Sequence, residues 1–223
     1  MWQHFFVKEK KILNKYIFML NDYPDYIWYK KDEMNIQKDN WNEYFKNSNP
    51  ICLEIGSGAG NFTVRMAEKF PDKNYIGLEI RFKRLVFSAR KAEKRNLKNI
   101  LFLRRKAEEL AECFGENEIS EVHINFPDPW DERLKNRIIS KKLLENLDIV
   151  LKKEGKIFVK TDHVGYYEDT LKLIEGSCEY KVIYHTDDFH NSDKSLENVK
   201  TEFEELFTLK EITTKYIEIQ KEV

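Results

Sequence analysis

Residues 125–130 read Asn-Phe-Pro-Asp-Pro-Trp and follow a short apolar run at 122–124. Each proline fixes its own φ angle and restricts the residue before it, so we expect a stiff, extended loop at the end of a strand. Such a loop would hold the carboxylate of Asp128 beside the aromatic ring of Trp130, a combination that could bind a flat, polar ligand. From these six residues alone, a rigid turn around a buried tryptophan is an equally good interpretation.

A glycine-rich turn upstream favours the binding site. Residues 51–60 read Ile-Cys-Leu-Glu-Ile-Gly-Ser-Gly-Ala-Gly, and apolar residues at helical spacing follow over 61–70. A strand, a glycine turn and a helix begin a nucleotide-type α/β domain, in which Gly56 and Gly58 would let the backbone approach a ligand. The spacing Gly-x-Gly-x-Gly after Glu54 differs from that of dinucleotide binders. It looks like motif I of the S-adenosylmethionine-dependent methyltransferases, although a purely structural turn is the alternative.

The acid near the glycines matches the charge of such a ligand. S-adenosylmethionine carries a sulfonium and an ammonium but no pyrophosphate, so a carboxylate at Glu54 would suit it. A second apolar run, 74–80, ends with Glu79. An acid about 20 residues after the glycines is where a ribose diol is bound, because two carboxylate oxygens can accept from both hydroxyls.

Composition limits the class of protein. A chain of 223 residues suits one domain with a substantial core, and 41% hydrophobic and 13% aromatic residues indicate a globular chain. No apolar run reaches the ~18–20 residues needed to span a bilayer, and the N-terminal residues do not resemble a signal peptide. The three cysteines are far apart and form no zinc pattern. We therefore expect a cytoplasmic protein with reduced thiols, no metal and no membrane partner.

Charge is unevenly distributed, although the net charge is only −1 and the isoelectric point about 6.6. Basic residues dominate 81–106 and recur over 133–142, while acids concentrate at 108–121 and 197–211. A neutral total can therefore hide a basic face. For the helix expected within 81–98, a solvated surface is at least as good an interpretation as RNA binding. The cluster at 133–142 is the better RNA candidate because it directly follows the Pro-Asp-Pro-Trp loop.

The hydrophobic pattern alternates between strand and helix. It predicts an α/β fold with a doubly wound, mostly parallel seven-stranded sheet and helices on both faces. Residues 1–48 form an aromatic-rich extension that is part of the main domain, 49–223, or packed on it; a helix is plausible near 9–20. We expect strands at 51–55, 74–80, 100–104, 121–126, 156–161, 179–186 and 215–221, and helices at 60–70, 82–95, 107–113, 137–152, 165–175 and near 198–208.

Ligands of such sheets bind outside the carboxyl ends of the strands. Glu54, Glu79 and Asp128 all fall at such ends, and so does Asp162 in the Lys-Thr-Asp after another apolar run. Residues 201–204, Thr-Glu-Phe-Glu, follow a polar loop and could face a base with two acids, a hydroxyl and an aromatic ring. A helix start, with the threonine as N-cap and the last glutamate as capping-box acid, is the stronger interpretation of that segment by itself.

Together these segments resemble the bacterial tRNA (guanine-N7-)-methyltransferases, which belong to the Rossmann-like class I methyltransferases. The most specific motifs are 125–130 and 201–204, and 53–60, 71–79 and 160–162 follow the same order and spacing. The resemblance implies S-adenosylmethionine as methyl donor, tRNA as partner and N7 of a variable-loop guanosine, usually at position 46, as acceptor. The implied donor contacts are Glu54, Gly56, Gly58, Glu79, Lys106, Ala107, Asn125 and Asp128, with Asp128 also the catalytic acid; the implied substrate contacts are Trp130, Arg133, Lys135, Arg137, Asp162, Thr201, Phe203 and Glu204.

Two segments depart from the family pattern. After Pro-Asp-Pro-Trp the family usually continues with Pro-Lys-Lys-Arg-His, whereas this chain reads Asp-Glu-Arg-Leu-Lys-Asn-Arg over 131–137, which is less basic. After the third strand the family often has Asp or Asn near the adenine amino group, where this chain has Lys106, Ala107 and Glu108. A lysine cannot accept a hydrogen bond from an amine, so a backbone group or Glu108 would serve instead.

The expected chemistry needs orientation more than proton transfer. Guanine N7 already has a lone pair, so the protein mainly brings the two reactants together. We expect Asp128 to accept from guanine N1–H and the amino group, and Trp130 or Phe203 to stack on the base. The alternatives are a methyltransferase for another RNA, a small molecule or a protein, a non-catalytic RNA-binding module, and an NAD-dependent dehydrogenase. Intact donor motifs and glycine spacing disfavour the last two. We expect His123 in the core and a monomer or homodimer.

Overall fold

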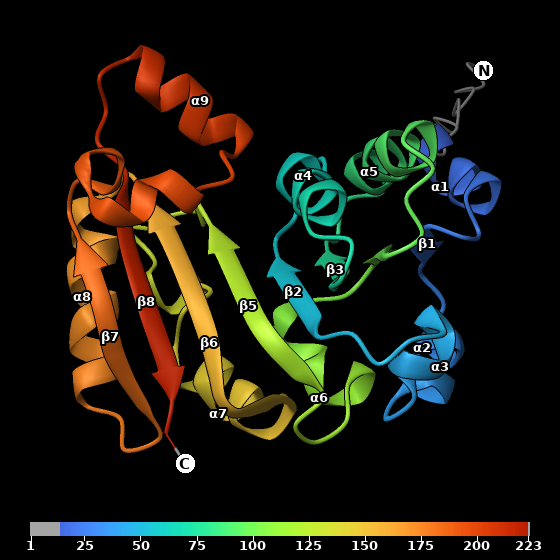
Figure 1. The fold of residues 1–223 in the computed structure, drawn as a ribbon, viewed down its shortest axis with the longest axis horizontal. Helices are drawn as coiled ribbons and strands as arrows, with labels where there is room; N and C mark the ends of the chain where they lie inside the picture. Colours follow the sequence, from blue (N-terminus) through green and yellow to red (C-terminus); the bar gives the residue numbers. More distant parts are fainter. Residues whose placement is uncertain (1–13, 223) are drawn as a thin grey trace, which may run out of the picture.

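Apolar runs form one sheet in residues 14–222, the part of the chain that the computed structural model describes. The strands are β1 (Ile27–Trp28), β2 (Ile51–Ile55), β3 (Asn74–Leu78), β4 (Ile100–Leu103), β5 (Ile119–Asn125), β6 (Leu151–Thr161), β7 (Tyr180–Thr186) and β8 (Lys215–Lys221). Their order across the eight-stranded sheet is β1-β4-β3-β2-β5-β6-β8-β7 (Figure 1). Neighbours from β1 to β6 are parallel, whereas β8 runs antiparallel to both β6 and β7. This confirms the doubly wound, mostly parallel sheet, with one strand more than predicted.

Helices cover both faces of this sheet. The α-helices are α1 (Lys15–Met19), α2 (Lys31–Gln37), α3 (Trp41–Phe45), α4 (Asn61–Lys69), α5 (Phe82–Lys94), α6 (Leu110–Cys113), α7 (Lys141–Val150), α8 (Val164–Glu175) and α9 (Glu202–Leu209). Short 3₁₀ helices lie at Leu20–Asp22, Ala107–Glu109, Leu134–Asn136, Phe189–Asn191 and Asp193–Glu197. Leu147 of α7 and Tyr166 of α8 are buried in one apolar cluster, and Val64 of α4 and Leu85 of α5 in another. Strands β2, β3 and β4 are buried along their whole length because apolar layers lie on both faces.

The structure adds β1, α2 and α3 within the extension and changes the bounds of one predicted helix. Strand β1 was missed because its two residues lie in the aromatic-rich extension, where they pair with β4. The helix predicted at 137–152 is wrong at both ends: α7 begins after Ser140, whose side chain caps it, and β6 already begins at residue 151. A helix was expected near 9–20. The structure shows α1 within that range, and residues 9–13 lie outside the described residues.

The described part of the extension packs against the main domain. Trp41 is fully buried, and its indole N–H donates to the Cys113 carbonyl at 3.0 Å. Its ring lies 5.6 Å from that of Trp28 and 5.5 Å from that of Phe114. Aromatic packing therefore joins α3 and β1 to the core, while the division at residue 48 stays a prediction.

The chain changes direction across the sheet between β2 and β5. It runs outward from β2 through β3 to β4, then returns to place β5 on the other side of β2, followed by β6. The carboxyl ends of these parallel strands share one edge, which is where ligands of such sheets bind. Figure 1 shows α9 beyond the ends of β5 and β6, at the same edge as the start of α4. Among residues 14–222, no helix is both long and apolar enough to cross a membrane.

Candidate active site

The glycine loop, defined here as residues 56–60, has a backbone that side chains would disturb. Gly56, Gly58 and Gly60 have φ angles of 76°, 57° and 73°, all in the left-handed region. A Cβ on Gly60 would lie 2.6 Å from the Ser88 hydroxyl oxygen, so packing against α5 also requires glycine there. A Cβ on Gly56 would meet nothing within 4 Å. The loop therefore packs tightly on α5 and leaves open space at Gly56.

One face of α5 fastens the glycine loop. The Lys91 ammonium donates to the Ala59 carbonyl at 2.8 Å, and the Ser88 hydroxyl donates to the Gly58 carbonyl at 3.3 Å. The Arg84 guanidinium lies 3.5 Å from a carboxylate oxygen of Glu79. Sequence reasoning treated these basic residues as a charged surface. Their spacing could have indicated that they act together, because residues three and four apart share a helix face.

Glu54 is a buried acid at the end of β2, with 5% of its surface exposed. It accepts a hydrogen bond from the Thr63 hydroxyl and another, at 3.0 Å, from the side-chain amide of Asn125. Burial raises the pKa of Glu54, and those hydrogen bonds oppose the rise. Asn125 ends β5, so this contact joins the two strands at which the sheet changes direction.

Glu79, directly after β3, is held by its own backbone neighbours. One carboxylate oxygen accepts from the N–H groups of Ile80 and Arg81 at 2.7 and 2.8 Å. The other oxygen lies 3.5 Å from Arg84. Ile80 is 49% exposed at the ligand end of the sheet, a feature that sequence reasoning did not single out.

These residues fit a cationic nucleoside such as S-adenosylmethionine. The buried Glu54 carboxylate would gain from a nearby cation, because a cation offsets the desolvation that raises its pKa. The Glu79 oxygen near Arg84 would accept a hydrogen bond from a hydroxyl, and the open space at Gly56 leaves room for close approach. Of the residues that resemblance placed near the adenine, Lys106 is exposed and Ala107 is buried. The Lys106 backbone N–H already donates to a Glu109 carboxylate oxygen at 3.0 Å.

The proline loop, residues 126–130, is not extended throughout as predicted. Phe126 and Trp130 both have a φ of 48°, in the left-handed region. The Phe126 N–H donates to the Lys160 carbonyl at 2.8 Å, and its ring lies 5.4 Å from that of Phe207. The chain thus turns sharply at Phe126, held by β6 and α9. Trp130 is 44% exposed, which excludes the buried-tryptophan alternative, and Asp128 is exposed beside it.

The basic residues after the proline loop differ in their surroundings. Arg133 and Lys135 are exposed, as a nucleic-acid contact would require. The Arg137 side chain is only 9% exposed and bonds within the protein. Its Nε donates to the Pro129 carbonyl at 2.6 Å, and a terminal nitrogen contacts Asp169 of α8 at 2.6 Å.

The capped segment, residues 198–209, follows the stronger interpretation of its sequence. Thr201 caps α9, and a reciprocal hydrogen bond from its backbone N–H reaches the Glu204 carboxylate, which completes the capping box. Glu204 is fully buried, whereas Phe203 is 50% exposed, with its ring 6.2 Å from that of Phe126. Of the three predicted substrate contacts here, Phe203 is the one whose side chain reaches the surface beside the proline loop.

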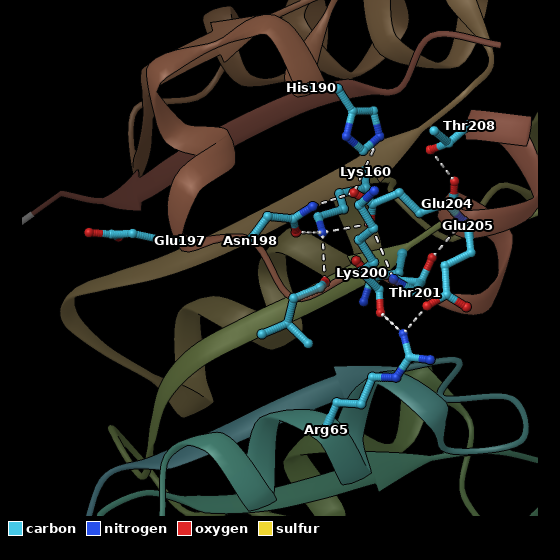
Figure 2. Close-up of polar contacts among 12 residues, drawn as sticks. Arg65, Lys160, His190, Glu197, Asn198, Lys200, Thr201, Glu204, Glu205 and Thr208 are labelled. Carbon is cyan, nitrogen blue, oxygen red and sulfur yellow. Dashed lines mark hydrogen bonds and ion pairs between the residues drawn. The ribbon is translucent and has the colours of Figure 1, made fainter. Parts of the chain in front are cut away.

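Lys160 connects the capped segment to the sheet, as Figure 2 shows. Its ammonium, on a residue only 5% exposed, lies 3.0 Å from a Glu204 carboxylate oxygen and donates to the Asn198 side chain. Burial lowers the pKa of Lys160, and Glu204 opposes that shift. Sequence reasoning assigned no role to this lysine. Asp162, two residues on, is half-buried.

A second contact holds the capped segment against α4. One guanidinium nitrogen of Arg65 donates to the Lys200 carbonyl and to the Glu205 carboxylate, both at 2.7 Å (Figure 2). The segment therefore spans from β6 to the helix that follows the glycine loop.

The remaining sequence predictions concern histidines and metals. His123 is buried in the core as expected, with its ring stacked 4.8 Å from that of Phe158. His185 contacts the Tyr167 hydroxyl at 2.7 Å. Within residues 14–222, no group of three or more His, Cys, Asp or Glu side chains is placed to hold a metal ion.

Comparisons with known proteins identify the family and several relatives of this chain. A family model described as "Putative methyltransferase" matches residues 48–216. A tRNA (guanine-N(7)-)-methyltransferase of Clostridium novyi is 37% identical over 188 residues, which cover 83% of this chain and 87% of the relative. A protein of the same name from Brevibacillus brevis is 34% identical over 191 residues, 85% of this chain and 87% of the relative.

Two further matches concern chain length and fold. A "Bifunctional glycosyltransferase/methyltransferase" of Fusobacterium nucleatum is 53% identical over 222 residues, 99% of this chain but 35% of that protein. This chain therefore spans about a third of that relative's length. Among solved structures, the 16S rRNA methyltransferase KamB has a TM-score of 0.64 at 16% identity and covers 83% of this chain and 94% of its own. That likeness concerns the fold.

Proposed function

The chain belongs to the tRNA (guanine-N(7)-)-methyltransferase family, and from that premise we propose that it transfers a methyl group from S-adenosylmethionine to N7 of a guanosine in tRNA. The acceptor is a guanosine of the variable loop, at position 46 in the family pattern. The protein works in the cytoplasm as a monomer or homodimer. The name of the Fusobacterium relative adds a glycosyltransferase activity, and that activity is assigned to the relative alone.

The observation that carries the proposal is the hydrogen bond between Asn125 and Glu54. It joins the residue that opens the Asn-Phe-Pro-Asp-Pro-Trp motif to the acid that precedes the glycine loop. The two motifs are far apart in sequence, yet they meet at the carboxyl ends of adjacent parallel strands. A donor bound at the glycine loop and a base bound at the proline loop would therefore lie next to each other.

The donor side of the site would bind by charge and hydrogen bonding. Bound S-adenosylmethionine supplies an activated methyl group on a sulfonium, whose thioether leaves as the C–S bond breaks. Glu54 would offset its positive charge, and Glu79 would accept from its ribose hydroxyls. Gly56 and Gly58 would let the backbone approach it, with Lys106 and Ala107 beside the adenine. These residues orient the donor and carry no proton in the reaction.

The acceptor side would select and orient guanine. Asp128 accepts hydrogen bonds from N1–H and the 2-amino group of guanine, neither of which adenine has, and so distinguishes the two bases. Trp130 and Phe203 are both half-exposed and offer aromatic faces for stacking. Arg133 and Lys135 contact phosphates, although they carry less charge than the family segment. Asp162 contacts the acceptor nucleoside, while Thr201 and Glu204 fix the start of α9, which carries Phe203.

The test is methyl transfer from labelled S-adenosylmethionine to unmodified bulk tRNA, with the modified base identified by mass spectrometry. We expect 7-methylguanosine in the variable loop. Methyl transfer to a different base, or to a protein or small molecule with none to tRNA, would refute the substrate assignment. Failure to bind S-adenosylmethionine would refute the donor assignment.

A further inference from the structure

Arg137 differs from the other basic residues of its segment because its side chain is already occupied. Arg133 and Lys135 are exposed, while only 9% of the Arg137 side chain is accessible. Buried guanidinium groups need partners for their five N–H donors, and here those partners are protein atoms. A phosphate would have to displace them. The surroundings therefore point away from the RNA contact that resemblance assigns to Arg137.

The contacts of Arg137 converge on the proline loop. Its Nε donates to the Pro129 carbonyl at 2.6 Å, and this carbonyl belongs to the peptide bond between Pro129 and Trp130. A second nitrogen contacts the Asp131 carboxylate at 3.2 Å. One side chain thus contacts the chain at Pro129, inside the loop, and at Asp131, directly after it.

The opposite side of the guanidinium is anchored on α8. A terminal nitrogen lies 2.6 Å from the Asp169 carboxylate, and the guanidinium carbon lies 4.9 Å from the centre of the Tyr166 ring. Tyr166 is 1% exposed and belongs to the apolar core, so this anchor is rigid. His163, which caps α8, also contacts Asp131 at 3.1 Å. The loop is therefore fixed to the core through α8.

We propose that Arg137 is a positioning residue, which fixes the proline loop so that Asp128 and Trp130 keep the geometry that the acceptor base requires. This proposal rests on the proposed function for its kinetic consequences. Arginine is required because its planar fork serves the Pro129 carbonyl and two carboxylates at once, whereas a lysine ammonium is a single point charge. Loss of Arg137 would leave the proline loop mobile. A mobile loop would reduce turnover more than it would weaken tRNA binding.

The kinetic test compares Arg137→Met with Arg133→Met. For Arg137→Met we expect kcat to fall roughly ten- to a hundredfold, because small misplacements of reacting groups have effects of that size. The salt dependence of tRNA binding should stay unchanged. Arg133→Met should instead weaken tRNA binding and lower the slope of log affinity against log salt by about 1, as one lost phosphate contact does. The conservative variant Arg137→Lys should resemble Arg137→Met.

A second measurement needs neither substrate nor activity. Amide hydrogen exchange in peptides covering 126–136 should speed up in Arg137→Met and stay at the wild-type rate in Arg133→Met. Asp169→Asn, which changes an exposed partner and leaves the core intact, should give a smaller increase in the same peptides. These exchange rates decide the positioning role even if the wild-type protein methylates no tRNA, so the two proposals fail separately.

Unchanged loop exchange and kcat in Arg137→Met, together with a reduced salt slope, would overturn the proposal and restore Arg137 as an RNA contact. If Arg137→Met does not fold, the exchange measurements on Asp169→Asn and Arg137→Lys test the proposal instead. If both of those variants fold and show wild-type exchange over 126–136, the proposal is also wrong.

Discussion

The two halves of the site are held by different kinds of contact. The glycine loop depends on backbone conformation and close packing, with left-handed glycines against α5. The proline loop and the capped segment depend on charged side chains, chiefly Arg137, Lys160 and Glu204. Fixed backbone groups suit a small ligand of constant shape. Ion pairs that hold segments with exposed aromatic rings suit the binding of one base of a much larger, charged partner.

Removing the buried ammonium of Lys160 should have the largest effect on stability, and the capped segment should be the part that loosens. We expect Lys160→Met to lower the free energy of unfolding by about 3–5 kcal/mol, because it removes the ammonium that lies 3.0 Å from the buried Glu204 carboxylate. Urea denaturation measures this change. Adding Glu204→Gln should recover part of the loss. A cost below about 1 kcal/mol for Lys160→Met would mean that the ion pair does not hold this half.

Asp128→Asn should leave the fold and the glycine loop untouched and act on the base alone. The amide presents a donor where guanine N1–H and its amino group need an acceptor, so we expect activity to fall by about 10- to 100-fold, the size of a hydrogen bond to a charged group. Single-turnover methylation of tRNA measures it, with donor affinity by calorimetry as the control. Full activity and full preference for guanine over adenine in the variant would show that Asp128 does not recognise the acceptor base.

Two glycine substitutions separate crowding from backbone strain in the glycine loop. Both Gly60→Ala and Gly56→Ala place an alanine at a left-handed φ, but only the first would meet a side-chain atom, 2.6 Å away on Ser88. We expect Gly60→Ala to lower the free energy of unfolding by about 1–3 kcal/mol more than Gly56→Ala does. Thermal or urea unfolding of both variants checks this. Equal losses would show that the packing on α5 contributes little.

The smallest expected effect is a pH dependence at Glu54. Burial raises its pKa above the ordinary value of 4.5, so folding favours its protonated form and, without ligand, stability falls as pH rises through that range. A cationic donor favours the ionised form. Affinity for S-adenosylmethionine should therefore increase as pH rises above 4.5. Calorimetry of the wild type and Glu54→Gln tests this, and a profile that persists in the variant would assign it to another group.

Sequence reasoning located the residues that follow from strand ends. Glu54, Glu79 and Asn125 lie at the site because parallel strands end at one edge, and periodicity identifies those strands. It gave Lys160 no role and assigned Arg137 to RNA, because Asp169 and Glu204, their partners within the protein, lie 32 and 44 residues further along the chain and the contacts exist only in the folded protein. The left-handed Phe126 was missed for a similar reason: rings on α9 and the Lys160 carbonyl decide its conformation, against the local preference before proline.

The antiparallel strand β8 also sets an order of assembly. It lies between β6 and β7 and pairs with β6 from Lys156 to Thr161, a stretch that includes Lys160, which holds the capped segment. The pairs β2–β3 and β3–β4, next to the glycine loop, need only residues 51–103. During synthesis, which proceeds from the N-terminus, the glycine loop can form while residues 215–221 are still to be made. The β6 edge that supports the capped segment is complete only when those residues are in place.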